Sequence, residues 1–156
     1  MQKDTSSDRD PQVDLGSPEL FLNRELSLLQ FQRRVLAQTL DPRLPLLERL
    51  RFLTICSSNL DEFFEVRVAG LEDQVKYGLD KPGIDGRTPG MALADISDAA
   101  HALVEEQYRA LNEEVLPQLQ AEGIHLLRRG EWDPAQREWV EQYFQEQVLP
   151  VLTPVA

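Results

Sequence analysis

The chain has 156 residues, of which 27 are acidic and 16 are basic, and its formal net charge is −11 at pH 7. This negative balance argues against a protein that binds nucleic acid through its phosphates, and no apolar run reaches the roughly 18 residues of a membrane span. Cys56 is the only cysteine, which excludes an internal disulfide and agrees with a reducing compartment. We therefore expect a soluble cytoplasmic protein without a secretory signal, with association with a membrane-bound complex left open.

The negative charge is unevenly distributed along the chain. Residues 88–123 contain seven acidic residues and one basic residue, Arg109, whereas acids and bases balance over residues 43–70. The acidity therefore belongs mostly to the solvent face of one predicted helix. An anion could lie near the neutral stretch, but a groove for a polyanion would have to come from elsewhere.

Two helices are predicted in the first half of the chain, after a disordered lead-in over residues 1–17, which are polar and without periodicity. Ser27 and Gln30 have the spacing of a capping box and predict the start of the first helix. Asp41 and Pro42 should end it, because proline disfavours helical geometry at the residue before it. Pro45 is suited to the first position of the second helix.

The second helix should break at residues 57–59 (Ser-Ser-Asn), which prefer caps to helix interiors. Asn59 would then cap a new helix that reaches about Tyr77. Its apolar residues recur at steps of three and four and predict one buried stripe, formed by Leu60, Phe64, Val68, Leu71 and Val75.

Glycines and prolines predict a loop over residues 78–88, after which Thr88 and Pro89 have the pattern of a helix cap and a first helical residue. The helix that follows should reach about Ala121, with Pro117 kinking it or ending it early. Gly123 is a suitable terminator.

The pattern changes after Gly123. Residues 124–127 (IHLL) predict a short strand, Asp133 and Pro134 predict the start of a helix that reaches about Gln147, and the proline-interrupted residues 148–156 predict an extended segment. We therefore expect a mainly α protein: a helical bundle over residues 18–123, followed by residues 124–156 as the first βα unit of an incomplete α+β domain.

Few residues suggest chemistry. The sequence has no glycine-rich phosphate loop and no Cys/His metal cluster. We interpret His101 and His125 as surface or packing residues, with His101 beside Glu105 one helical turn away. The carboxylates of Asp61, Glu62 and Glu65 lack an accompanying histidine, so they fit first-turn acids better than a metal site; no metal ligand is predicted.

The unusual arrangement is that of Asn59, Phe63 and Arg67, which at i, i+4 and i+8 share one side of a helix. An amide, an aromatic face and a guanidinium in that order can hold a purine edge, stack on it and offer charge to a phosphate. The alternative is that Asn59 is a cap, Phe63 belongs to the core and Arg67 is paired within the bundle.

Several blocks of sequence resemble the N-terminal region of the polyphosphate kinase family. Residues 20–27 and 31–36 (LFLNRELS, FQRRVL) resemble its opening helix, and residues 45–53 (PLLERLRFL) its second helix. Residues 57–64 and 66–71 (SSNLDEFF, VRVAGL) form the most specific block. Two positions depart from the family, which usually has Trp where this chain has Leu28 and Asn where it has Gln32.

The resemblance implies an enzyme that reversibly transfers the terminal phosphate of ATP to polyphosphate through a phosphohistidine, with Mg²⁺. It also implies a helical N-terminal domain, a head domain that forms a homo-oligomer, and later domains that hold the phosphohistidine and the magnesium ligands outside this chain. Asn59 matches a residue that contributes to ATP binding on the adenine side; Phe63 and Arg67 are weaker candidates, and neither His101 nor His125 is the nucleophile. The alternative function is a structural interaction or dimerisation module that contacts no ligand.

Overall fold

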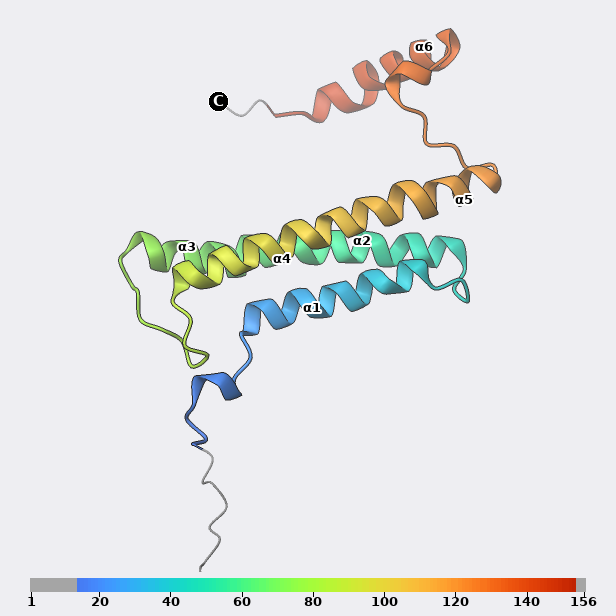
Figure 1. Ribbon diagram of the computed structural model, residues 1–156. Helices are drawn as coiled ribbons and strands as arrows, with labels where there is room; N and C mark the ends of the chain where they lie inside the picture. The colour runs from blue at the N-terminus through green and yellow to red at the C-terminus, as the bar shows by residue number, and fades with distance from the viewer. Residues whose placement is uncertain (1–13, 154–156) are drawn as a thin grey trace, which may run out of the picture. The chain divides into compact units, whose positions relative to one another are not determined.

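The computed structural model describes residues 14–153, which form helices and connecting loops without any strand (Figure 1). Most of the predicted lead-in, residues 1–13, lies outside the described residues. The chain divides into two compact units, the first ending at Val115 and the second beginning at Leu116. None of the helices in the described part of the chain is long and apolar enough to cross a membrane.

Helix α1 (Arg24–Ala37) begins earlier than the sequence predicted. The Oδ1 atom of Asn23 accepts a hydrogen bond from the backbone N–H of Leu26 at 3.0 Å, so Asn23 is the cap and Ser27 lies inside the helix. The prediction that Ser27 caps this helix was therefore wrong. Both residues are good caps, and the earlier one also bonds to Asp85 in a distant loop, which favours it. A short 3₁₀ turn, η2 (Gln38–Leu40), follows α1.

The second and third predicted helices form one helical run composed of α2 (Leu46–Glu62), the π-helical segment η3 (Phe63–Val68) and α3 (Ala69–Lys76). The predicted break at residues 57–59 was wrong. The Asn59 side chain bonds to Gln32 of α1 and does not compete for its own backbone, so the helix passes through this residue.

The π segment also changes which aromatic residue is buried. Leu60, Phe63 and Val68 are buried, whereas Phe64 is 42 % exposed. The prediction that Phe64 belongs to the buried stripe was wrong because η3 places one more residue in the turn than an α-helix would. Phe63 therefore takes the core position, and the next buried residue lies five positions later.

The loop over residues 78–88 and the start of the next helix agree with the sequence. Helix α4 (Pro89–Arg109) begins after Thr88, whose side chain accepts a hydrogen bond from the N–H of Met91 at 3.3 Å. The π segment η4 (Ala110–Val115) and helix α5 (Leu116–Ala121) follow without an intervening loop.

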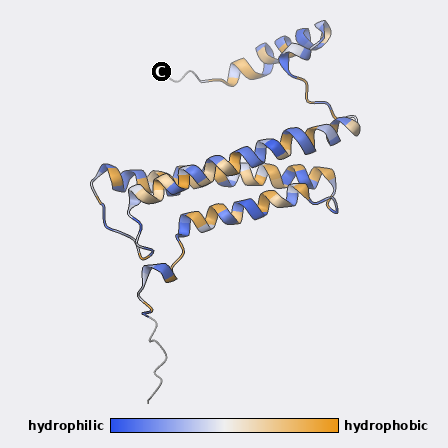
Figure 2. Cartoon of the chain, viewed as in Figure 1, coloured by the Kyte–Doolittle hydropathy of each residue, from blue (hydrophilic) through white to orange (hydrophobic). Residues whose placement is uncertain are grey.

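The core of the first unit lies between α1, α2 and α4, each of which packs on at least one of the others. Apolar and polar residues alternate along each of these helices (Figure 2). The buried apolar side chains of these helices are Leu29, Leu36, Leu53, Cys56, Leu60, Ala92, Ile96, Ala100 and Leu103. Full burial of a leucine or isoleucine side chain contributes about 1.5–3 kcal/mol, so this interior is the main source of stability for the unit.

The second unit contains helix α6 (Pro134–Tyr143), the π segment η6 (Phe144–Val148) and the 3₁₀ turns η5 (Arg129–Glu131) and η7 (Leu149–Val151). The predicted start of α6 is confirmed, since the side chains of Asp133 and Gln136 each accept a hydrogen bond from the backbone N–H of the other. The prediction that residues 148–153 are extended was wrong over η7; residues 154–156 lie outside the described part.

The predicted strand at residues 124–127, and with it the βα unit, was also wrong. Gly123 adopts a positive φ of 80° and donates its N–H to the carbonyl of Gln120, while Ile124 donates to Leu119 at 2.9 Å. These two bonds form the C-terminal cap of α5. Ile124, the first residue of the predicted strand, is part of this cap. The described residues offer no second strand with which it could pair.

Candidate functional site

The three residues singled out from the sequence line one pocket of the first unit. Asn59 lies in the last turn of α2, and Phe63 and Arg67 lie in η3. The pocket has a volume of about 270 Å³, and its remaining lining residues are Leu28, Gln32, Glu62 and Val66. The structure therefore brings the predicted amide, aromatic ring and guanidinium to the same pocket, with α1 as its other wall.

Asn59 is half-buried and is held by a residue of the neighbouring helix. Its Nδ2 atom donates a hydrogen bond to Oε1 of Gln32 at 2.9 Å. An amide has two donor hydrogens and one acceptor oxygen, so the second hydrogen and Oδ1 are left over. Within the described residues, neither makes a further hydrogen bond. The alternative that Asn59 is only a cap fails, because the residue is inside a helix.

Phe63 contributes less open surface than the sequence suggested. The side chain is 3 % exposed, and its ring meets that of Phe64 edge to face, with centroids 5.6 Å apart. This geometry is a favourable aromatic packing arrangement. Phe63 therefore fits the alternative of a core residue, and it can contribute little surface to the pocket wall.

Arg67 carries the positive charge of the pocket. Its side chain is half-buried, and within the part of the chain that the structure describes it makes no hydrogen bond or ion pair. The alternative that Arg67 pairs with another residue of the bundle was therefore wrong for the described residues. A half-buried guanidinium without a partner has its five donors available for an anion.

Sequence reasoning did not single out Gln32 as a site residue. It is 4 % exposed and lies on α1 between the buried residues Leu29 and Leu36. A glutamine on the apolar side of a helix was a usable signal, because a buried amide needs a hydrogen-bond partner. Its partner, Asn59, could not be found from local sequence because it lies on another helix.

Both histidines are exposed, as their surface interpretation expects. The Nδ1 atom of His101 lies 2.7 Å from the carbonyl oxygen of Ser97, one turn earlier in α4. The interpretation of Asp61, Glu62 and Glu65 as first-turn acids was wrong, because the helical run passes through Asn59 and Asp61 and Glu62 lie in the last turn of α2. Among the described residues, no group of three His, Cys, Asp or Glu side chains could hold a metal ion.

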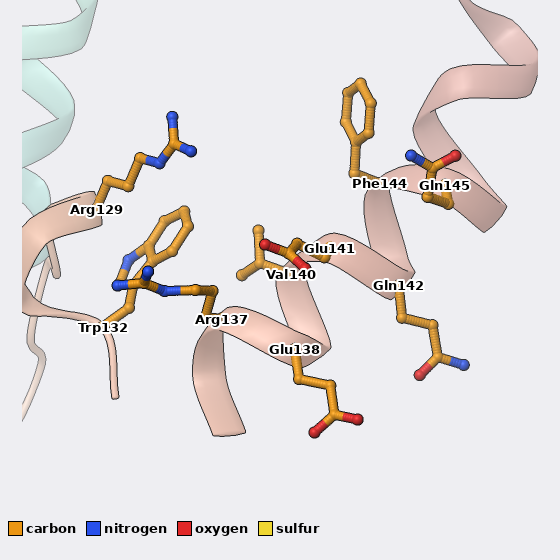
Figure 3. A pocket seen from close by; sticks show the side chains of 9 residues that line it. All are labelled: Arg129, Trp132, Arg137, Glu138, Val140, Glu141, Gln142, Phe144 and Gln145. Atoms are coloured by element: carbon orange, nitrogen blue, oxygen red, sulfur yellow. The ribbon is translucent and has the colours of Figure 1, made fainter. Parts of the chain in front are cut away.

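A larger hollow lies in the second unit, on α6 and the segment before it (Figure 3). Its volume is about 760 Å³, and its lining includes Arg129, Trp132, Arg137 and Phe144. However, none of residues 120–153 is buried, so this is an open surface and not an enclosed site. The pocket at Asn59 is the better candidate because a packed core holds its side chains in place.

Comparison with known proteins agrees with the helical architecture of the first unit. The family model described as the polyphosphate kinase N-terminal domain matches residues 21–127, which include every residue of the pocket. The chain belongs to this family. The pocket should therefore be compared with the corresponding region of other members of this family.

Individual relatives give the same result. The chain is 50 % identical over 141 residues to a polyphosphate kinase of Pseudomonas putida, covering 90 % of this chain and 19 % of the relative. It is 51 % identical over 134 residues to one of Neisseria meningitidis serogroup B, covering 86 % and 20 %. The crystal structure of polyphosphate kinase from Porphyromonas gingivalis matches with a TM-score of 0.68 and 31 % identity, over 85 % of this chain and 18 % of that one. The chain therefore spans about a fifth of the length of these relatives.

Proposed function

We propose that this chain is the N-terminal segment of a cytoplasmic polyphosphate kinase, which reversibly transfers the terminal phosphate of ATP to polyphosphate. In this proposal the pocket at Asn59 covers the adenine side of the nucleotide. Family membership supports the activity, and the unused donor and acceptor of Asn59 support the role of the pocket.

The chemistry of Asn59 fits an adenine edge. Adenine presents an amino donor next to an acceptor nitrogen, and an asparagine amide can pair with both at once. Asn59 can do so without giving up its bond to Gln32, because that bond uses only one of its two donor hydrogens. Arg67, at the same pocket, would add positive charge towards a phosphate, and Phe63 would support the wall.

The catalytic groups would lie outside this chain. We assign no phosphohistidine and no Mg²⁺ ligand to the described residues, whose acids do not gather into a metal site. Phosphoryl transfer depends on positioning and on charge neutralisation, and a base-side pocket contributes to positioning alone. The isolated chain should therefore make no polyphosphate. We also propose that the helical domain ends near residue 123 and that the head domain beyond it mediates oligomerisation.

The test is Asn59→Ala in the full-length enzyme. Loss of a bidentate amide–base pair costs about 1–3 kcal/mol, so the KM for ATP should rise by about 5- to 150-fold. The KM for polyphosphate in the reverse reaction should stay unchanged, as should both constants in Ser58→Ala, which alters an exposed neighbour. An unchanged KM for ATP in Asn59→Ala would refute the assignment.

One observation favours a second candidate, a purely structural module. The bond between Asn59 and Gln32 joins α1 to α2 and could be the whole purpose of both side chains. In that case Asn59→Ala would lower the melting temperature and leave the KM for ATP unaltered. Because the bond to Gln32 is present under both candidates, the melting temperature should fall in either case, and the two candidates differ in whether the KM for ATP rises.

A further inference from the structure

We propose that Gln32 is a second nucleotide-contacting residue of the pocket at Asn59, and that its side-chain amide donates a hydrogen bond to a ring nitrogen of the base. This inference rests on the proposed function and deepens it, because it adds a second contact to the adenine site. The burial of Gln32, its place in the pocket lining and the unused hydrogen of its amide support it.

Gln32 is a polar residue held within the core of the first unit. It is 4 % exposed and lies on α1 between Leu29 and Leu36, which are both buried. Close packing around it restricts its rotamers, so the amide is held in place before a ligand binds. Because buried amides are normally hydrogen-bonded, an unused N–H at such a position calls for a partner.

The Gln32 amide keeps an unused hydrogen whichever way it is turned. Gln32 and Asn59 share one hydrogen bond of 2.9 Å, from Nδ2 of Asn59 to Oε1 of Gln32. The two amides can also turn over together and form the equivalent bond from Nε2 of Gln32 to Oδ1 of Asn59. An amide nitrogen carries two hydrogens, and Nε2 makes no other hydrogen bond within the described residues, so at least one hydrogen is unused in both arrangements.

The unused N–H reaches the pocket. Among the described residues, Oγ1 of Thr39 is the only side-chain nitrogen or oxygen that is fully enclosed and lacks a hydrogen-bond partner. Nε2 of Gln32 also lacks a partner in the first arrangement, so it is not fully enclosed, although the residue is almost entirely buried. Gln32 lines the pocket together with Asn59, and the pocket is therefore the space that this atom meets.

The two amides together match the hydrogen-bonding groups of adenine. Adenine has a single amino donor but several acceptor ring nitrogens, so it requires more donors than acceptors from the protein. The bonded pair of amides has this balance, because it carries four hydrogens and two oxygens and its mutual bond uses only one of each. One oxygen remains for the amino group, and an N–H of Gln32 remains for a ring nitrogen.

The experiment uses the full-length enzyme with Gln32→Met, which keeps the size of the side chain and removes the donor. Loss of one hydrogen bond should raise the KM for ATP by about 2- to 12-fold. The KM is also measured with 1-deaza-, 3-deaza- and 7-deaza-ATP, each of which lacks one ring nitrogen. The effect of Gln32→Met should disappear with the analogue that lacks the contacted nitrogen, because the variant then has no bond left to remove. The same factor with ATP and with all the analogues would overturn the proposal.

A matched control comes from another buried glutamine. Gln107 of α4 is 8 % exposed and donates its Nε2 to the carbonyl of Leu53 at 3.4 Å, but it does not line the pocket. Gln107→Met should lower the melting temperature and leave the KM for ATP and for each analogue unchanged. A rise in KM that is equal in both variants would refute the contact, because it would reflect general loosening of the bundle.

The wild-type enzyme decides the matter if Gln32→Met does not fold. At least one analogue should then have a KM about 2- to 12-fold above that of ATP, and this difference should persist in Asn59→Ala, where Gln32 is the remaining amide. Equal KM values for ATP and all the analogues would overturn the proposal without any variant. An effect of Asn59→Ala without any effect of Gln32→Met sinks this inference alone, whereas no effect of Asn59→Ala sinks the proposed function itself.

Discussion

Replacement of Asn23 by alanine should remove two interactions that hold the start of α1 in place. The Oδ1 atom of Asn23 caps the helix, and its Nδ2 atom donates to Oδ2 of Asp85 at 2.8 Å across the loop that precedes α4. Loss of a cap costs about 1 kcal/mol, and loss of a hydrogen bond to a carboxylate about 1.5 kcal/mol or more. The side chain of Asp85 is 8 % exposed, so water replaces the lost bond poorly. We expect Asn23→Ala to lower the free energy of unfolding by about 2–3 kcal/mol.

The assay is urea unfolding of the 156-residue chain at pH 7, followed by far-ultraviolet circular dichroism. Asn23→Ser is the matched control, because serine caps a helix but is too short to reach Asp85. Its loss should be about 1 kcal/mol smaller than that of Asn23→Ala. Equal losses for the two variants, or a loss below about 0.5 kcal/mol for alanine, would show that these contacts do not stabilise the fold as reasoned.

The same contact predicts a pH dependence with a definite sign. The hydrogen bond from Asn23, and further contacts from Arg87, hold the pKa of Asp85 below its ordinary value. A carboxyl with a depressed folded-state pKa stabilises the protein fully above its unfolded pKa of about 3.9 and loses this contribution as the pH falls towards the folded value. The difference in stability between wild type and Asn23→Ala should therefore be constant at neutral pH and should shrink below about pH 4.

Three further predictions concern the first unit. The buried Arg49 donates its Nε to a backbone carbonyl of η2 at 2.6 Å, so Arg49→Met should cost about 1–3 kcal/mol in urea unfolding, and Arg49→Lys, which lacks the planar fork, should not restore it. Gly86 has φ 76°, and an added Cβ would lie 3.2 Å from Cβ of Pro18; Gly86→Ala should thus destabilise by more than Gly78→Ala, where φ is 71° and no atom lies within 4 Å. Cys56 is fully buried and burial raises the pKa of its thiol, so it should react with a disulfide reagent at pH 7 only after the chain unfolds in denaturant.

Local signals predicted the helix starts that depend on neighbouring residues alone. The caps at Thr88 and Asp133, each followed by proline, are found as expected, because a side chain three residues away is enough to form them. The same rule gave the wrong start for α1, since Asn23 and Ser27 are both acceptable caps and a distant contact to Asp85 favours the first. The predicted helix break at residues 57–59 was wrong for a related reason, because the hydrogen bond of Asn59 to Gln32 on α1 outweighed the local preference of these residues for a cap.

The site was partly predictable for the same physical reason. The spacing of Asn59, Phe63 and Arg67 lies within one helical run, so sequence alone could place them on one side, and they do line one pocket. The exposure of each was not predictable, because the π segment changes which side chains enter the core. Gln32 could not be assigned to Asn59 at all, since the two are joined only by the packing of α1 on α2.

The π-helical segment η3 contains one more residue than a turn of regular α-helix would. Omission of the exposed Glu65 would bring Phe63 and Val68 to a spacing of four, the ordinary repeat of an α-helix, and both could stay in the core. Omission of a residue in the regular part of α2 would instead rotate everything after it by about 100° about the helix axis and expose the apolar face. The chain should therefore tolerate loss of one residue in η3, next to the pocket, but not loss of one residue in the regular helix before it. Relatives whose helical runs differ in length by one residue should differ at η3.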